Sequence, residues 1–357
     1  MLVSDFDFNL PDKLIAQEAA PRGDSRMLVL DRESGQMEHA SVGELPRFLR
    51  ADDLLVVNNT RVFAARLLGR RVPSGGAVEC LLLSLPAPSA DGSVECDALM
   101  HPGQKLKPGA LVEFEGEAGT LRCEVIERQF FGRRRIRLSV DRVSPGHAAA
   151  VDALVDALGH IPLPPYIKRA DTPADRDRYQ TIFAIHRGSV AAPTAGLHFT
   201  PALVRELDSA GIERVAVTLH VGYGTFKPVR AERVEDHTVD PEHYEIEPDA
   251  ADRLNRARDD NRRIVAVGTT TTRALEDAAR RGRGRVPAGA AEASTFIFPG
   301  YRFQVISGLL TNFHLPKSSL LMLVAAFAGR EHVLNAYGEA IARQYRFYSY
   351  GDAMLIV

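Results

Sequence analysis

The hydrophobic positions in the first 140 residues predict a strand-rich region that changes character at about residue 67. Residues 26–66 indicate two strands around a turn, a helix opened by the capping box of Ser41 and Glu44, and the apolar strand DLLVVNNTRV. Short β-type runs then follow to about residue 140, separated by Gly, Pro, Asp and Ser and without a helical period. This spacing is typical of a small antiparallel barrel or sandwich.

Helical patterns return after the β-rich stretch and then alternate with strands. AAAVDALVDALG predicts a helix, and IPLPPYI leaves it as a stiff extended segment. Residues 201–210 predict a helix capped by Thr200, and RVAVTLHV, RIVAVG and FQVISGLLTNF predict strands between helices. The alternation indicates an α/β domain of residues 1–66 and 151–357 with a largely parallel sheet, interrupted by an inserted small antiparallel β-barrel domain of residues 67–150.

Polar residues gather where three predicted strands end, at 220–226 (HVGYGTF), 268–273 (GTTTTR) and 311–316 (TNFHLP). Ligands bind at the carboxyl ends of strands in open α/β sheets, so we expect these segments to share one pocket. We expect residues 189–199 (SVAAPTAGLHF) to join them, because a run so poor in bulky side chains lets a ligand approach the backbone. The helix N-terminus behind this run would favour an anionic group. A tight structural turn is the alternative interpretation.

The four segments carry side chains that transfer protons or hold anions. The candidates are His198, His220, His314 and Thr194 for catalysis, and Thr225, Thr269, Thr270, Arg273 and Asn312 for ligand binding. Histidine titrates near neutral pH, and arginine holds a carboxylate or phosphate. Any one of these histidines can instead be a buried side chain with satisfied hydrogen bonds, and it is their shared position at strand ends that favours a site.

Composition and charge narrow the class of protein. The 357 residues are 45% hydrophobic, which predicts a soluble globular protein of two domains. The net charge of −2 argues against coating nucleic acid through overall positive charge but leaves a local patch open, with Arg133, Arg134 and Arg135 as candidates or as solvated surface. No stretch is apolar enough to span a bilayer and no signal sequence is recognisable, so we expect a cytoplasmic location.

Several familiar chemistries are not indicated. Cys80, Cys96 and Cys123 are odd in number and far apart, so we expect reduced structural thiols. Residues 236–245 (DHTVDPEHYE) gather histidines and carboxylates without the spacing of a zinc motif, so we expect no metal. The chain has no GxxxxGKS/T phosphate loop, no GxSxG elbow and no complete dinucleotide fingerprint.

The same segments resemble those of a known family. SVAAPTAGLHF, TLHVGYGTF, VGTTTTRALE, LLTNFHLPKSSLLMLV and YRFYSYGDAM are similar to motifs of the S-adenosylmethionine:tRNA ribosyltransferase-isomerases of queuosine biosynthesis. FDFNLPDKLIAQ, SRMLVLDR and LLVVNNTRVFAARLLG resemble the opening of that family in the same order, so the similarity covers nearly the whole chain. The resemblance implies an α/β catalytic domain with an inserted small β-barrel, in agreement with the hydrophobic pattern.

The resemblance also implies a reaction and its partners. Family members transfer the ribosyl unit of S-adenosylmethionine, a co-substrate, to 7-aminomethyl-7-deazaguanine in the anticodon wobble position of tRNA. They isomerise it to an epoxycyclopentanediol and release adenine and methionine. The expected partners are therefore this tRNA and S-adenosylmethionine, with no metal and no membrane, and we expect a monomer.

Residue roles follow from this resemblance and the substrate chemistry. The sulfonium acidifies the adjacent 5′ carbon, so His198, His220 or His314 would act there as a base or donate a proton to departing adenine. Arg273 and the threonines after Gly268 would hold the methionine carboxylate. The further expected contacts are Gly222 and Gly224 for close backbone approach to the ligand, and Asn59 and Arg61, with the three barrel arginines, for RNA phosphates.

Two other function classes stay open. The chain departs from the family pattern at Asn59, Tyr223 and Val239–Pro241, so the same chemistry on a different acceptor is an alternative. A hydrolase that cleaves a nucleoside or S-adenosylmethionine without RNA would use the same pocket, and an RNA-binding module would catalyse nothing. Adenine release that requires the acceptor tRNA would distinguish the transferase from both.

Overall fold

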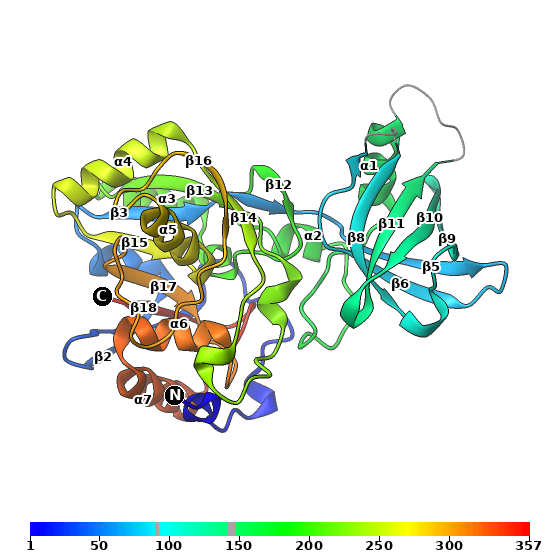
Figure 1. Cartoon of the computed structure of the whole chain (residues 1–357). Helices are drawn as coiled ribbons and strands as arrows, with labels where there is room; N and C mark the ends of the chain where they lie inside the picture. The colour runs from blue at the N-terminus through cyan, green and yellow to red at the C-terminus, as the bar shows by residue number, and fades with distance from the viewer. Residues whose placement is uncertain (90–92, 141–146) are drawn as a thin grey trace.

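The larger domain is built on a mixed nine-stranded sheet, with a barrel domain beside it (Figure 1). The computed structural model describes residues 1–89, 93–140 and 147–357. The sheet order is β16-β14-β13-β3-β15-β17-β18-β1-β2. The strands are β1 Arg26–Leu30, β2 Met37–Ser41, β3 Leu54–Asn58, β13 Glu213–Leu219, β14 Glu242–Ile246, β15 Ile264–Val267, β16 Gly289–Ala293, β17 Gly308–Asn312 and β18 Ala353–Ile356. A separate parallel pair consists of β4 Thr60–Val62 and β12 His186–Ser189.

The large sheet is parallel at its centre and again between β18 and β1. Strands β13, β3, β15 and β17 run in one direction, so their carboxyl ends meet at one end of the sheet. Strand β14 is antiparallel to β13 and to β16, β18 is antiparallel to β17, and β2 is antiparallel to β1. The predicted α/β class is confirmed, whereas the expectation of a largely parallel sheet is wrong at both edges.

Helices cover both faces of the sheet because buried side chains alternate along each strand. In β15, Ile264 and Ala266 belong to one core cluster, and Val265 and Val267 belong to the other. The first face carries α4 Pro248–Asp259, α5 Thr269–Arg281, α6 Ser319–Ala328 and α7 Arg330–Ala342, and the second carries α3 Pro201–Ser209 and η3 Val42–Phe48. The predicted capping box forms, but the helix that follows it, η3, is a 3₁₀ helix. Within the described ranges, no helix is long and apolar enough to cross a membrane.

The smaller domain is a closed antiparallel barrel, as the strand spacing predicted. Its strands are β5 Arg66–Val72, β6 Ala77–Leu82, β7 Ala87–Pro88, β8 Val94–His101, β9 Leu111–Gly116, β10 Gly119–Arg128 and β11 Arg133–Ser139. Strand β11 pairs with β8, which closes the ring β11-β10-β9-β5-β6-β8. The barrel core holds Cys80, Cys96 and Cys123 as free thiols, and burial raises the pKa of Cys96 to about 12.

Helix α1, His147–Leu158, packs on the barrel rather than on the large sheet. Val151 and Val155, one helical turn apart, belong to the barrel core. The barrel module therefore extends beyond residue 150, where the sequence pattern had placed its end.

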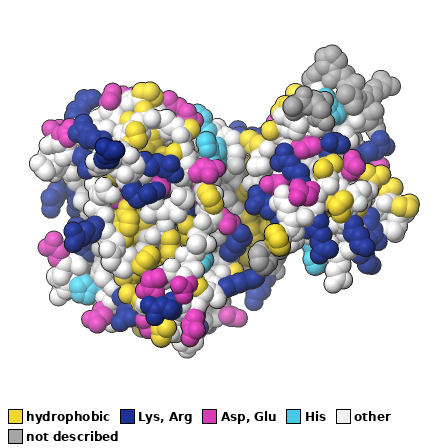
Figure 2. Space-filling model, viewed as in Figure 1, with side chains coloured by type: hydrophobic (Ala, Val, Ile, Leu, Met, Phe, Trp, Pro, Cys, Tyr) yellow, Lys and Arg dark blue, Asp and Glu magenta, His cyan; other side chains and the backbone are white. Residues whose placement is uncertain are grey.

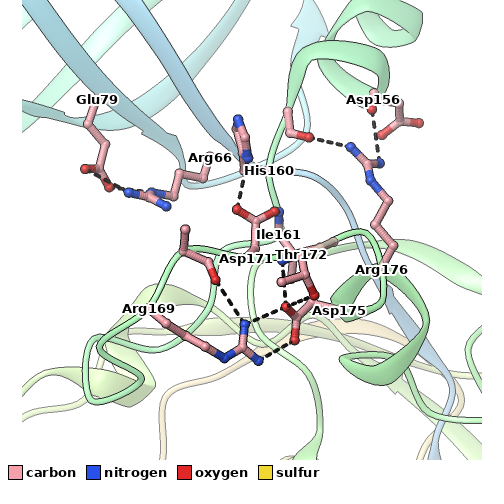
Figure 3. Close-up of polar contacts among 12 residues, drawn as sticks. Arg66, Glu79, Asp156, His160, Ile161, Arg169, Asp171, Thr172, Asp175 and Arg176 are labelled. Atoms are coloured by element: carbon pink, nitrogen blue, oxygen red, sulfur yellow. Dashed lines mark hydrogen bonds and ion pairs between the residues drawn. The ribbon is translucent and has the colours of Figure 1, made fainter. Parts of the chain in front are cut away.

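Residues 160–178, which we call the strap, lead the chain from the barrel back to the larger domain (Figure 3). Two carboxylates fix its path. Asp171 accepts hydrogen bonds from the backbone N–H of Ile161 at 3.0 Å and lies 2.9 Å from Nδ1 of His160. Asp175 accepts two hydrogen bonds from Arg169, at 2.7 and 2.9 Å. The strap is thus held by local ion pairs close to both domains.

Candidate active site

The predicted strand-end segments meet around one cavity of about 290 Å³. Ala191–Ala195 and Gly268–Thr270 form two of its walls, Asn312 and His314 line a third, and Thr225 lies on a fourth. The parallel arrangement of the central strands produces this convergence, because the segments that follow β15 and β17 emerge at the same end of the sheet.

The cavity contains one of the three predicted histidines. Nε2 of His314 lies 2.8 Å from Oγ1 of Thr311, and the backbone N–H of His314 donates to the hydroxyl of Tyr337 at 2.9 Å. Burial lowers the pKa of His314 to about 3. The imidazole is therefore uncharged at neutral pH, where it can accept a proton or a hydrogen bond but cannot act as a cationic acid.

His198 lies behind the cavity and does not line it. Nδ2 of Asn312 is 3.1 Å from Nε2 of His198, and burial lowers the pKa of His198 to about 4. A neutral Nε2 accepts the amide hydrogen bond, while the other amide hydrogen is donated to the carbonyl of Tyr348 at 3.1 Å. His198 thus orients Asn312, whose Oδ1 remains available.

The helix N-terminus at the cavity belongs to α5. Gly268 has φ 95°, a conformation that favours glycine, and it offers no side chain to cap the helix. Thr269 and Thr270 line the cavity, so the first N–H groups of α5 lie at its wall. The hydroxyls of Thr271 and Thr272 bond instead to carbonyls four residues earlier. An anionic ligand group would be stabilised at this end of α5.

The expectation for the helix that follows residues 189–199 is corrected. Oγ1 of Thr200 accepts the N–H of Leu203 at 3.0 Å, so α3 has its predicted cap. Neither residue lines the cavity, although Thr194, seven residues before the start of α3, does so. Residues 189–199 therefore contribute backbone and Thr194 to the wall, while the anion-favouring helix start comes from α5.

Three buried polar atoms of the cavity residues have no hydrogen-bond partner among the described residues. They are Oγ1 of Thr270, Oδ1 of Asn312 and the hydroxyl of Tyr348. Buried polar groups are nearly always paired, so their clustering indicates a ligand that supplies the partners. Sequence reasoning found the first two and missed Tyr348, because nothing in the spacing of YRFYSYGDAM separates it from the neighbouring tyrosines.

The structure does not bring His220 to the cavity. Nδ1 of His220 lies 2.7 Å from Oγ1 of Thr60, and its ring stacks on His243 with centroids 6.1 Å apart. A Cβ at Gly188 would lie 2.7 Å from the imidazole, so backbone packs directly against it. His220 stabilises the β4–β12 region, and its expected catalytic role has no support in this geometry.

Arg273 is likewise engaged elsewhere. Its Nη1 donates to Oε2 of Glu242 at 2.6 Å, and both side chains are buried. The other oxygen of Glu242 accepts hydrogen bonds from the N–H of Gly222 and the hydroxyl of Thr225, each at 3.0 Å. Gly224 lies beside this group without lining the cavity. A protein carboxylate, rather than the ligand, thus neutralises Arg273.

The predicted RNA-contacting residues are in different environments. Arg134 is 1% exposed and donates to the carbonyls of Gly103 and Leu106, so its expected role in RNA contact is corrected to a structural one. Asn59 is also buried, with Oδ1 accepting the hydroxyl of Thr218. The remaining predicted residues lie nearer the surface: Arg61 is exposed, Arg133 pairs with Asp97, and Arg135 pairs with Glu95.

Residues 236–245 do not form a metal centre. The ring of His237 packs edge-on against Phe296, with centroids 5.0 Å apart, and burial lowers its pKa. In the described part of the chain, no group of three or more His, Cys, Asp and Glu side chains is placed to hold a metal ion.

An α/β sheet with helices on both faces, and a cavity with unpaired polar groups at the carboxyl ends of its parallel strands, defines an enzyme that binds a small molecule. The inserted barrel distinguishes this chain from α/β enzymes that consist of the sheet domain alone, and it agrees with the family that the sequence motifs resemble. The chain belongs to the family of queuosine biosynthesis proteins, whose family model matches residues 3–356.

Curated relatives and a solved structure carry a common name. The S-adenosylmethionine:tRNA ribosyltransferase-isomerase of Heliobacterium modesticaldum is 48% identical over 358 residues, and that of Aquifex aeolicus is 45% identical over 360, each alignment covering both chains fully. The crystal structure of S-adenosylmethionine tRNA ribosyltransferase from Thermotoga maritima is 34% identical, with a TM-score of 0.53 over 99% of this chain and all of that one.

Proposed function

We propose that this protein transfers the ribosyl unit of S-adenosylmethionine to 7-aminomethyl-7-deazaguanine in the anticodon wobble position of tRNA and isomerises it, giving epoxyqueuosine with release of adenine and methionine. One observation carries the proposal: in a chain of this family, the cavity at the strand ends holds three buried polar atoms without partners. A ligand with several hydrogen-bonding groups matches them. We further propose that the protein acts in the cytoplasm as a monomer, which light scattering would test against 39.1 kDa.

The cavity walls suit a ligand with a carboxylate at one end. Among the described residues that line it, none is Asp or Glu, whereas Lys227 and Lys317 lie at its wall. Each of these lysines pairs with an aspartate outside the cavity. The N-terminus of α5 therefore offers the available N–H groups for the methionine carboxylate, in the role that the sequence had suggested for Arg273.

Of the three histidines considered for proton transfer, His314 is the one that lines the cavity, so we assign the proton transfer to it. Removal of a proton from the carbon next to the sulfonium requires a group with a lone pair in the cavity, and His314 is the predicted histidine that lines it. We propose His314 as the proton acceptor because of its position in the cavity. Burial lowers its pKa and keeps it neutral, which leaves a ring nitrogen with a lone pair but makes the imidazole a weaker base than a free histidine. Loss of adenine and attack by the aminomethyl nitrogen would follow.

The acceptor RNA is proposed to approach through a second cavity, of about 440 Å³, between the two domains. Pro162–Pro165 of the strap, Gly132 of the barrel and Val190 of the larger domain line it. Consecutive residues line the two cavities, with Val190 at the second and Ala191 at the first. Figure 2 shows this junction as a notch between the two lobes, bordered by Lys and Arg side chains.

The barrel carries an exposed aromatic residue beside this junction. Phe130 is 87% exposed and lies two residues before Gly132, which lines the second cavity. The bonds of Arg134 hold the loop Gly103–Lys107 against the same end of the barrel. We name this the barrel-end surface, consisting of Phe130 and the exposed cations Lys105, Lys107, Arg128 and Arg133. An aromatic side chain among cations is suited to unstacked bases of an RNA loop.

The test measures adenine released from S-adenosylmethionine, with and without tRNA that carries 7-aminomethyl-7-deazaguanine. The matched control is the same tRNA with guanine at that position, which lacks the attacking amine. Release only with the modified tRNA, together with the mass gain of the ribosyl-derived group on the RNA, supports the proposal. Release without RNA would indicate a hydrolase, and tRNA binding without release would indicate a binding module.

A further inference from the structure

Tyr348 is held in an uncommon conformation at the wall of the first cavity. Its φ is 73°, in the left-handed region that bulky residues rarely adopt. Its N–H donates to the carbonyl of Phe313 at 3.1 Å, and its own carbonyl accepts from Nδ2 of Asn312 at 3.1 Å and from the N–H of Gly351 at 2.8 Å. Strain of this kind persists where the surrounding structure fixes it, and it is concentrated at functional sites.

The side chain of Tyr348 is fixed as well. Its ring stacks on that of Tyr166, with centroids 4.3 Å apart and planes at 23°, and the hydroxyl of Tyr166 is hydrogen-bonded to Ser349. Tyr348 is 5% exposed, and its hydroxyl has no partner among the described residues. Burial raises the pKa of Tyr348, so the phenol stays neutral and can donate a hydrogen bond.

The neighbouring unpaired atoms define the complementary ligand. Both amide hydrogens of Asn312 are donated, to His198 and to the carbonyl of Tyr348, so this side chain can offer a ligand only its acceptor, Oδ1. The unpaired hydroxyls of Thr270 and Tyr348 can donate. A 6-aminopurine presents an exocyclic N–H donor next to a ring nitrogen that accepts, which matches an amide oxygen and a hydroxyl that line the same cavity.

We propose that Tyr348 is a substrate-contacting residue whose hydroxyl, together with Oδ1 of Asn312, recognises the adenine of an adenine nucleoside in this cavity. The proposal rests on the proposed function, in which S-adenosylmethionine supplies that adenine. It also predicts that the base, and not only the methionine end, determines which sulfonium nucleoside binds.

The experiment measures adenosine and inosine binding by calorimetry, without RNA, on wild type, Tyr348→Phe and Tyr345→Phe. Inosine lacks the exocyclic amine. Tyr345 is the matched control, because its hydroxyl is buried but pairs with Nδ1 of His39 at 2.8 Å, away from the cavity. We expect Tyr348→Phe to weaken adenosine binding about tenfold without lowering the Tm, since an unpaired hydroxyl is removed. We expect Tyr345→Phe to lower the Tm and to bind adenosine like the wild type.

The outcomes separate this proposal from the proposed function. Wild-type adenosine affinity in Tyr348→Phe, equal binding of inosine by the wild type, or no adenosine binding by the wild type would each overturn the assignment. A fall in both Tm and affinity would assign the hydroxyl to the fold. If adenosine binding depends on Tyr348 but adenine is never released in the presence of tRNA, the recognition stands and the transferase proposal fails.

Discussion

Glu242 and Arg273 form a buried ion pair, with Oε2 of Glu242 2.6 Å from Nη1 of Arg273. The pair links strand β14 to helix α5, whose N-terminus lines the first cavity. Through its second oxygen, Glu242 also holds the N–H of Gly222 and the hydroxyl of Thr225. The guanidinium of Arg273, which the sequence analysis had assigned to the ligand, is thus paired with Glu242. This pair connects the wall that contains the N-terminus of α5 to the wall that contains Thr225.

Replacement of Glu242 by alanine should destabilise the protein by about 3–5 kcal/mol, because Arg273 would remain buried without a counter-charge. Urea denaturation of Glu242→Ala measures this loss. Glu245→Ala, on the exposed face of the same strand, is the control and should change the free energy of unfolding little. A second variant, Arg273→Ala, tests the alternative role. If Arg273→Ala keeps the stability of the wild type but raises the KM for S-adenosylmethionine, Arg273 binds the ligand rather than stabilising the fold.

The strap should depend on Asp175 in the same way. Asp175 accepts two hydrogen bonds from Arg169 and one from the hydroxyl of Tyr350, and these bonds hold the pKa of its carboxyl well below the usual range despite burial. Asp175→Asn should lower the free energy of unfolding by about 2–3 kcal/mol at pH 7. Asp177→Asn, exposed in the same short helix, is the control. Equal stability of the two variants would show that the Arg169 pair contributes little.

The buried histidines predict a loss of stability in mild acid. Burial lowers the pKa of His314 to about 3 and that of His198 to about 4, from a usual value near 6.5. Between about pH 4 and 6.5 the unfolded chain therefore binds more protons than the folded one, and stability falls as the pH falls. Each histidine should contribute on the order of 2 kcal/mol between pH 7 and pH 5.

Denaturation of His314→Gln at pH 7 and pH 5 isolates one of these contributions. The variant should lose less stability than the wild type over this interval, by about the amount for one histidine. His101→Gln, at an exposed position of the barrel, should behave like the wild type. An identical pH dependence in all three proteins would contradict a neutral, buried His314.

The fold was predictable where the period of the hydrophobic residues was clear. The burial of Arg134 could also have been predicted from that period, although the sequence analysis placed this residue on the surface. In strand β11 the alternation that buries Ile136 and Leu138 also buries Arg134, two residues earlier. Charge suggested the surface, whereas the period of two required the interior. The guanidinium is tolerated there because it reaches carbonyls at the end of the barrel.

Other features of the site could not be predicted from a single chain. The strand ends identified the segments around the cavity, because sheet topology alone brings them together. The separation of His314 from His220 depends on side-chain directions after each strand, and the engagement of Arg273 depends on Glu242 from another strand. The position of Tyr348 at the cavity depends on its left-handed backbone and on the stacking of its ring against Tyr166. Tyr166 lies 182 residues earlier in the sequence, so a single sequence could not predict this contact.

The barrel-end surface gives a prediction that concerns RNA alone. Phe130→Ala should raise the KM for the modified tRNA about tenfold, because stacking of a base on an aromatic ring contributes about 1–3 kcal/mol. The kcat and the KM for S-adenosylmethionine should not change, since Phe130 does not line the first cavity. Phe130→Trp keeps an aromatic ring at this position and should bind tRNA like the wild type. Leu111→Ala, which removes another exposed apolar side chain of the barrel, should have no effect.

Salt dependence separates stacking from charge at this surface. Arg128→Ala removes an exposed cation two residues before Phe130, so it should weaken tRNA binding and also reduce the slope of affinity against salt by about one phosphate contact. Phe130→Ala should weaken binding at every salt concentration and leave that slope unchanged, because a stacked base releases no counterion. If Phe130→Ala leaves tRNA affinity unchanged while Arg128→Ala reduces the slope of affinity against salt, the RNA contacts this end of the barrel through RNA phosphates and not through RNA bases.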